Sequence, residues 1–341
     1  MTEMINVPAS VPPTLRPYVS AMLHGLWGWV TRPLQVIVKA GVPDALGEDP
    51  QSAAALAAVT GCDADALDRF LRMLAACDIF ERRPDNTYAH TPISRCLRRD
   101  SPFAAAPSAL LQGMPVYQAA LANLEHTLRT GLPAIDSVAP NGFFGYLRAH
   151  PDEARIFDAA MTSLRATHND RITTAYDFSA SNVIADIGGG QGALLGSILE
   201  RAPNVRAVLF DLPDVVAGTA STPRLRVQAG DFFRDPLPAA DLYILKLILH
   251  DWPDAAALKI LAAIRRSAQP GVKLLVIEAI MTDEPGFSPS HVMDLSMLAL
   301  TGGRERNERQ FGELFAATGF RLARTIPTES PVSTIVEAVA A

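Results

Sequence analysis

The feature that most constrains this chain is an apolar run that leads directly into a cluster of glycines. The run Val183–Ile187 is followed by four glycines within positions 188–192, and then by a predicted helix over Ala193–Arg201. Glycine is required where a Cβ would block a tight turn or keep a ligand away from the backbone. The pattern therefore predicts a buried strand, a binding loop and a helix, in that order.

The region after about residue 182 alternates between short apolar runs and helical segments. Alternation at this spacing is typical of an α/β fold, in which a mostly parallel sheet is wrapped by helices. Beyond the run described above, the predicted strands are 206–210, 225–228, 242–249, 272–277, 320–325 and 332–339.

The N-terminal region follows a different pattern. Residues 18–45 show helical spacing, and Leu26-Trp27-Gly28-Trp29 carries more apolar surface than one short helix can bury alone. We expect it to pack against another element or another subunit. Two short helices over 53–59 and 64–76, followed by a hairpin over 79–90, predict a winged helix-turn-helix.

These patterns predict two domains. A mostly helical winged-helix domain is expected over 1–100, and a second domain over 101–341. Within the second, we expect a helical lid or connector over 101–180 and an α/β core over 181–341, which the family resemblance described below implies to be Rossmann-like.

A winged helix often binds DNA, so the charge of this region matters. Residues 51–100 contain seven acidic residues and seven arginines, and the whole chain has a net charge of −6 and a pI of about 5.7. A surface that faces phosphates is clearly positive. The sequence therefore predicts no nucleic-acid partner, and a structural or dimerisation role for the winged helix.

The composition is that of a globular protein, with a mean hydropathy of +0.15. No stretch approaches the ~18 apolar residues of a membrane-spanning helix, and the first residues lack the pattern of a secretion signal. The cysteines Cys62, Cys77 and Cys96 have no metal-ligand spacing. We expect a cytoplasmic protein without a metal and without a membrane partner.

The ligand of the glycine loop is ambiguous from the loop alone. Gly188, Gly190 and Ala193 fit a dinucleotide motif, which also suits an adenosyl-sulfonium ligand. Asp211 ends the second predicted strand, where a carboxylate can accept ribose hydroxyls. Asp231 follows the third, beside Phe232, and an acid next to an aromatic ring suits an adenine. In open α/β sheets ligands bind over the carboxyl ends of the strands, where all of these residues fall.

The candidate reactive groups lie at the same edge. His250 follows the fourth predicted strand, Glu278 ends the fifth, and Glu305 lies in the segment Gly-Gly-Arg-Glu-Arg over 302–306. A lone histidine after a strand is more often structural, but its place beside the glycine loop favours a catalytic role.

The order of the motifs GGGQG, FDLP, GDFF, LKxxLHDW, IE and GGRER resembles the caffeic-acid type of small-molecule O-methyltransferases, including bacterial members that act on antibiotics and pigments. The resemblance covers nearly the whole chain. It implies a homodimer with an N-terminal winged-helix dimerisation domain, and a Rossmann-like sheet of seven strands with the last strand antiparallel. It also implies S-adenosyl-L-methionine as methyl donor and S-adenosyl-L-homocysteine as product.

The resemblance assigns a role to residues at each motif. His250 is expected to be the base, flanked by Glu278 and Glu305. Ordinary core packing remains an equal alternative for Phe157, Met161 and Met297, and the segment 298–302 departs from the plant pattern by lacking an asparagine. The expected cofactor-binding residues are Asp186, Gly188, Gly190, Asp211, Leu212, Asp231, Phe232 and Lys246, and the expected substrate-binding residues are Phe157, Met161, Asp251, Trp252 and Met297.

These residue types suit methylation of a phenol. A phenol has a pKa of ~10 and is neutral at pH 7, whereas a histidine has a reference pKa of ~6.5 and can accept its proton. A carboxylate on the other ring nitrogen would fix the tautomer; Glu278 or Glu305 could supply it, and we favour Glu278. The alternatives are a family member with non-methylating chemistry, a DNA-binding regulator and a nicotinamide dehydrogenase.

Overall fold

The computed structural model describes residues 12–101, 105–282, 284, 288–330 and 333–341. The chain divides into two compact units. The N-terminal unit comprises residues 1–118 and 150–163, and the C-terminal unit comprises residues 119–149 and 164–341.

The N-terminal unit contains the predicted winged helix-turn-helix. The helices α4 and α5 pack on a small antiparallel sheet of order β1-β3-β2. Ser52 caps α4 and Asp63 caps α5, each accepting a backbone N–H in the first turn. The elements are α1 Arg16–Gly25, α2 Gly28–Lys39, α3 Val42–Leu46, β1 Gln51–Ser52, α4 Ala53–Thr60, α5 Ala64–Ala75, β2 Phe80–Arg82, β3 Thr87–His90, α6 Pro92–Arg95 and α7 Ala106–Gln112.

The core of this unit joins the helices to the hairpin. Leu56 from α4, Leu71 and Leu74 from α5, and Phe80 from β2 are buried together. Tyr88 of β3 is also buried, and its hydroxyl donates to Asp68 Oδ1 at 2.8 Å. The hydroxyl therefore keeps a partner inside the core, as a buried polar group requires.

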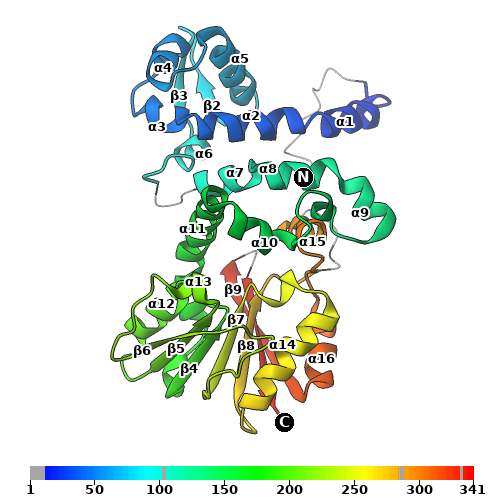
Figure 1. Ribbon diagram of the computed structural model, residues 1–341. Coiled ribbons are helices and arrows are strands. Elements are labelled where there is room, and N and C mark those ends of the chain that lie inside the picture. The colour runs from blue at the N-terminus through cyan, green and yellow to red at the C-terminus, as the bar shows by residue number, and fades with distance from the viewer. Residues whose placement is uncertain (1–11, 102–104, 283, 285–287, 331–332) are drawn as a thin grey trace. The chain divides into compact units, whose positions relative to one another are not determined.

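The C-terminal unit is built on a sheet of seven strands in the order β6-β5-β4-β7-β8-β10-β9 (Figure 1). The first five strands of this order pair in parallel, while β10 is antiparallel to both β8 and β9. The predicted α/β class is confirmed, including the antiparallel last strand. The strands are β4 Val183–Ile187, β5 Arg206–Asp211, β6 Leu225–Ala229, β7 Leu242–Lys246, β8 Lys273–Glu278, β9 Phe320–Ser330 and β10 Ser333–Ala340.

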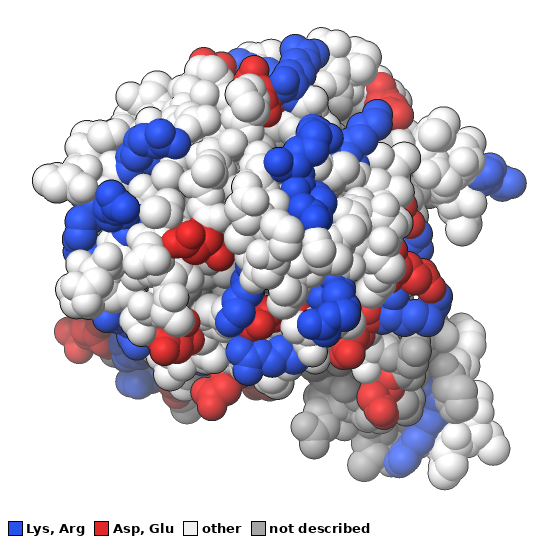
Figure 2. All heavy atoms as spheres, turned by 90° about the horizontal axis from the view of Figure 1, so that it is seen from below, with Lys and Arg blue, Asp and Glu red and all other residues white. Residues whose placement is uncertain are grey.

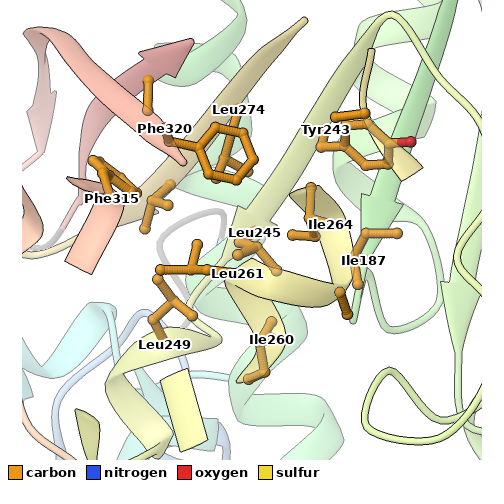
Figure 3. Close-up of a cluster of buried hydrophobic side chains, with 14 of the residues drawn as sticks. Ile187, Tyr243, Leu245, Leu249, Ile260, Leu261, Ile264, Leu274, Phe315 and Phe320 are labelled. Carbon is orange, nitrogen blue, oxygen red and sulfur yellow. The ribbon is translucent and has the colours of Figure 1, made fainter. Parts of the chain in front are cut away.

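Helices cover both faces of this sheet. One face packs against α14 Asp254–Ser267 and α16 Glu308–Ala317 through a buried cluster drawn in Figure 3, in which Ile260 and Leu261 of α14 lie beside Leu249. The other face packs against α12 and the last turns of α11. The remaining helical elements are α8 Pro115–Ala122, α9 Leu124–Thr130, η1 Ala134–Ser137, α10 Gly142–Ala149, α11 Pro151–Ala175, η2 Phe178–Ala180, α12 Ala193–Arg201, α13 Pro213–Val216, η3 Leu249–Asp251 and α15 Pro289–Leu300.

Strand β7 is shorter than predicted. The apolar pattern extends to Leu249, but β7 ends at Lys246, and Leu247 has a φ of +54°. The chain then enters the short helix η3. Leu249 remains buried in the core, which explains why an apolar pattern alone could not locate the end of the strand. Residue 332, the predicted start of the last strand, lies outside the described residues.

The face drawn in Figure 2 shows basic and acidic side chains interspersed among uncharged ones. Within the described residues, no helix combines the length and the apolar character needed to cross a membrane.

Candidate active site

The candidate site lies within the C-terminal unit, at the edge where the parallel strands end. Lys246, Asp211 and Glu278 are the last residues of β7, β5 and β8, and the glycine loop follows β4. Because these strands are neighbours in one sheet and run in parallel, their carboxyl ends meet at one edge.

The glycine loop is packed tightly against the segment that follows β7. Gly188 has a φ of +73°, and a Cβ on it would lie 2.5 Å from Ile248 Cδ1. Its N–H donates to the carbonyl of Phe210 at 2.7 Å. The positive φ therefore favours glycine at this position, and an added Cβ would also force the side chain of Ile248 to move.

Asp211 is fixed beside this loop. Its Oδ2 accepts the N–H of Gly190 at 2.8 Å, and its Oδ1 accepts the N–H of Leu212 at 2.7 Å. Asp211 is therefore fixed next to the glycine loop, and its contact with ribose hydroxyls stays a prediction. The buried Asp186 of β4 underlies the same loop, since a Cβ on Gly189 would lie 2.7 Å from its Cγ.

An aromatic group adjoins the third acidic residue. Asp231 Oδ1 accepts the N–H of Phe233 at 2.8 Å. The ring of Trp252 lies 4.8 Å from that of Phe233 and 6.2 Å from that of Phe232, edge-on to both. Trp252, predicted among the substrate-binding residues, thus contacts the loop that carries the predicted adenine-binding residues.

Lys246 has a partner that the sequence did not indicate. The side chain is buried, with 7% of its surface exposed, and Nζ donates to Asn169 Oδ1 at 2.6 Å. Asn169 is itself buried, on α11. The two residues are 77 positions apart, so no local pattern could have paired them.

His250 lies in η3 and its imidazole is buried. Nδ1 lies 2.7 Å from Glu305 Oε1 and donates its proton to that carboxylate. Nε2 lies 3.9 Å from Asp251 Oδ1. The carboxylate of Glu305 thus occupies Nδ1, and Nε2 is the nitrogen through which the ring gains or loses a proton.

The preference for Glu278 as the partner of the imidazole is wrong. Glu278 Oε1 accepts the backbone N–H groups of Ile248 and His250, each at 3.1 Å. Because β8 is the direct neighbour of β7, the side chain at the end of β8 reaches the backbone of the segment that follows β7. Glu278 therefore holds the turn that carries His250, whereas Glu305 holds the ring.

Burial and charge both act on these groups. Burial by itself would lower the pKa of His250, but the carboxylates of Asp251 and Glu305, and more weakly Glu278, outweigh it and raise the pKa to about 10. Burial raises the pKa of Glu278 to about 7 and that of Asp251 to about 6, although His250 opposes both shifts. The pKa of the imidazole is therefore raised, and so are those of two neighbouring carboxyl groups, Glu278 and Asp251.

The other predicted residues are placed as follows. Met297 lies on α15, half-buried, and its carbonyl accepts the N–H groups of Thr301 and Gly302 at 2.9 Å. Phe157 and Met161 are half-buried and belong to the N-terminal unit, so their role beside an acceptor stays a prediction.

The loop that the family resemblance assigns to the cofactor has a backbone suited to close approach of a ligand. Two glycines with positive φ, Gly188 and Gly190, adjoin the fixed carboxylate of Asp211.

In the described part of the chain no group of three or more His, Cys, Asp and Glu is arranged to hold a metal ion.

Comparison with known proteins gives matches along most of the chain. Residues 122–321 match the model of the O-methyltransferase domain, and residues 24–100 match that of the O-methyltransferase dimerisation domain. A phenazine O-methyltransferase of Lysobacter antibioticus is 37% identical, over 94% of this chain and 96% of the relative. A mitomycin biosynthesis 6-O-methyltransferase of Streptomyces lavendulae is 34% identical, over 94% of this chain and 93% of the relative.

A solved structure is similar in both sequence and fold. It is an O-methyltransferase from neocarzinostatin biosynthesis, in complex with S-adenosylmethionine and 2-hydroxy-5-methyl naphthoic acid. It has a TM-score of 0.79 and 31% identity, covering 91% of this chain and 96% of that one. With the two family models, these matches show that the chain belongs to the S-adenosylmethionine-dependent O-methyltransferase family and carries the family's dimerisation domain at its N-terminus.

Proposed function

We propose that this enzyme methylates a phenolic hydroxyl of a small aromatic natural product, with His250 as the general base. The observation that carries the proposal is the bond of 2.7 Å between His250 Nδ1 and Glu305 Oε1, which orients the ring and leaves Nε2 as the nitrogen that exchanges a proton. A base held by a third group is a recurring arrangement for activating a weak nucleophile.

Different residues at the edge of the sheet would bind the cofactor and remove the proton of the acceptor. Gly188, Gly190, Asp211 and Asp231 would hold the cofactor, which supplies a methyl group already activated by its sulfonium charge. The protein then has to align the acceptor oxygen and remove its proton. Nε2 of the neutral His250 would accept the phenolic proton as the acceptor oxygen takes the methyl group, and the sulfonium charge would be lost as the S–CH₃ bond breaks.

Glu305 supports this step in two ways. Its carboxylate accepts the Nδ1 proton, which orients the ring and fixes the tautomer. It also stabilises the imidazolium that forms when Nε2 is protonated, because the pair is buried and poorly screened by water.

The acceptor class is proposed from the relatives. Their names specify a phenazine and a bound hydroxynaphthoic acid, which are fused aromatic rings. We propose that Asp251, whose Oδ1 lies 3.9 Å from His250 Nε2, binds a second hydroxyl or an amine on such a ring. By the same reasoning we propose that the enzyme works as a homodimer, in keeping with its dimerisation domain.

A second candidate is a family member that binds the cofactor without transferring its methyl group. The assembled pair of His250 and Glu305 argues against it, because chemistry that removes no hydroxyl proton has no use for an oriented buried base.

The proposal is tested with S-adenosylmethionine carrying a deuterated methyl group. Purified enzyme and an extract of aromatic metabolites are incubated with it, and mass spectrometry identifies the products that gain the label. We expect a labelled aromatic ether, and expect His250→Ala to lower its rate at least ~100-fold while S-adenosylhomocysteine affinity stays near that of wild type. Full activity of His250→Ala would show that His250 is not the base. Tight S-adenosylhomocysteine binding with no labelled product in any extract would favour the non-methylating alternative.

A further inference from the structure

Arg306 is the largest fully buried side chain among the described residues, with 0% of its surface exposed. A buried arginine is rare because removing its charge from water costs free energy unless every donor is paired. A buried arginine is therefore expected where its hydrogen bonds or its positive charge hold neighbouring groups in place.

The guanidinium makes five hydrogen bonds, as many as it has N–H groups. Two go to Asp254 Oδ1, from Nε at 3.0 Å and from Nη2 at 2.8 Å. Nη1 donates to the carbonyls of Leu249 at 2.9 Å and Arg304 at 3.4 Å, and Nη2 donates to that of Trp252 at 2.8 Å.

Two of these carbonyls flank the candidate base. Leu249 is the first residue of η3, and Trp252 is the residue directly after η3. One planar guanidinium therefore bonds the backbone at both ends of this short helix, which is called the His250 turn below. Because the guanidinium is rigid, the relative positions of the two carbonyls are set by its geometry.

The segment before Arg306 closes on the same turn. The N–H of Arg304 donates to the carbonyl of His250 at 2.9 Å. A Cβ on Gly303 would lie 2.0 Å from that carbonyl oxygen and 2.6 Å from the carbonyl carbon of Asp251. Glycine is needed at 303 because the backbones of the two segments are in direct contact.

The turn is thus held from two sides. Glu278 accepts its N–H groups, at Ile248 and His250, and Arg306 donates to its carbonyls. The backbone of Arg306 is itself attached to the segment that follows β8, through the bond from Met281 N–H to its carbonyl at 3.0 Å. Neither residue bonds the imidazole in any contact described above.

We infer that Arg306 is a positioning residue for methyl transfer, which clamps the turn of His250 through the carbonyls of Leu249 and Trp252 and so fixes where the imidazole stands. The inference rests on the proposed role of His250 as the base. It assigns to the second arginine of the Gly-Gly-Arg-Glu-Arg segment a function distinct from that of Glu305.

The test uses Arg306→Lys, which keeps the positive charge and can keep one bond to Asp254. A lysine has three donors on one nitrogen and cannot span both carbonyls. A shift of about 1 Å in a catalytic group can cost ~100-fold in rate. We expect kcat to fall ~10- to 100-fold, with KM for S-adenosylmethionine and affinity for S-adenosylhomocysteine changed less than about twofold.

A matched control is Arg265→Lys. Arg265 also donates to three carbonyls, of Gly319, Ala268 and Ala341, but it lies near the far end of α14 from Asp254. A purely structural role for Arg306 predicts that both variants lose thermal stability and that neither loses kcat per folded molecule. Equal effects of the two variants on kcat would overturn the inference.

A second variant moves the turn without touching Arg306. Gly303→Ala places a methyl group against the carbonyl of His250, and we expect a loss of kcat similar to that of Arg306→Lys. Gly312→Ala is its control, because the nearest atom to a Cβ there is Leu322 Cδ2 at 3.8 Å. Soluble Gly303→Ala enzyme with wild-type kcat would overturn the inference even if Arg306→Lys fails to fold.

A readout independent of activity separates this inference from the proposed function. The His250 imidazole is titrated by ¹⁵N NMR in wild type, Arg306→Lys and Arg265→Lys. Since Arg306→Lys retains the charge, a changed pKa of His250 in this variant alone reports a displaced ring. If His250→Ala is fully active, the proposed function fails; if His250→Ala is inactive while Arg306→Lys keeps wild-type kcat and the wild-type titration, this inference alone fails.

Discussion

Glu278 Oε1 lies 3.1 Å from the backbone nitrogen of His250, while the imidazole of the same histidine is bonded to Glu305. Two buried carboxylates therefore act on one residue at different places. Glu278 holds the backbone on either side of Leu249, and Glu305 fixes the orientation of the imidazole ring.

This division predicts different outcomes for two substitutions at one position. In Glu278→Gln the side-chain carbonyl can still accept the N–H groups of Ile248 and His250, so we expect kcat within a few-fold of wild type. In Glu278→Ala both buried groups lose their acceptor, at about 1–3 kcal/mol for each unsatisfied group, and we expect a large loss of kcat and of melting temperature. Steady-state kinetics and thermal unfolding measure both. If Gln is as harmful as Ala, the negative charge of Glu278 and not its backbone bonds is what matters.

The raised pKa of Glu278 also predicts a pH dependence of stability. Its pKa is raised from 4.5 to about 7, mainly by burial. Between these values the folded protein binds a proton that the unfolded chain has released, so stability falls as the pH rises through this window. Glu278→Gln does not titrate. We expect its unfolding free energy, relative to wild type, to increase from pH 4.5 to 7, as measured by urea unfolding. A difference independent of pH would contradict the burial of an ionisable carboxyl at this position.

Gly188 couples the glycine loop to the turn of His250. Gly188→Ala combines a φ of +73° with a Cβ 2.5 Å from Ile248 Cδ1. We expect at least about tenfold weaker binding of S-adenosylhomocysteine by calorimetry, equivalent to ~1.4 kcal/mol. The matched control is Gly271→Ala, where φ is +82° but no atom lies within 4 Å of the added Cβ. Wild-type binding by Gly188→Ala would show that glycine is not needed there, and equal losses in both variants would point to general destabilisation by the positive φ.

The sheet could be predicted from sequence because its signal is local. The runs at Val183–Ile187 and near β8 are short, apolar and bounded by turn residues, and each became a strand close to its predicted limits. The common edge for Asp211, His250 and Glu278 then followed from the parallel arrangement alone.

The partners within the site could not be predicted in this way. His250 and Glu305 are 55 positions apart, and His250 and Glu278 are 28 apart. Both carboxyls were expected near the histidine, but which oxygen meets the ring and which meets the backbone depends on the path of the chain after β7. The positive φ of Leu247, in the middle of an apolar run, sets that path and has no sequence signal.

Exposed apolar side chains on the N-terminal unit predict an interface with a second copy of the chain. Along α1 and the start of α2, Tyr18, Met22, Leu26 and Trp29 are exposed, the last with 72% of its surface accessible. A group of large, solvent-exposed apolar side chains is typical of a protein–protein interface. We expect wild type to be a dimer by light scattering and Trp29→Glu to shift toward monomer. Val59→Glu is the control, since Val59 is 71% exposed on α4 outside this run. Dimers of unchanged stability in Trp29→Glu would place the interface elsewhere.

The raised pKa of His250 opposes its role as a base, and binding of the cofactor can lower it. In the free protein burial would lower the pKa of His250, but the carboxylates of Asp251 and Glu305 raise it to about 10, which favours the imidazolium over the neutral base at neutral pH. Its favourable interactions contribute to stability below pH ~6.5, the unfolded pKa, and that contribution is lost as pH rises toward 10. We expect the stability advantage of wild type over His250→Gln to shrink across this range.

A nearby positive charge disfavours a second one. We therefore expect S-adenosylmethionine, which carries a sulfonium charge, to lower the pKa of His250 toward neutrality, while the neutral S-adenosylhomocysteine leaves it nearly unchanged. ¹⁵N NMR titration of the histidines, with His250→Gln used to assign the signal, measures the pKa in each state. An equal shift with both ligands would point to burial by the adenosyl group as the cause. A pKa already near 6.5 in the free protein would mean that Asp251, Glu278 and Glu305 do not together stabilise the imidazolium.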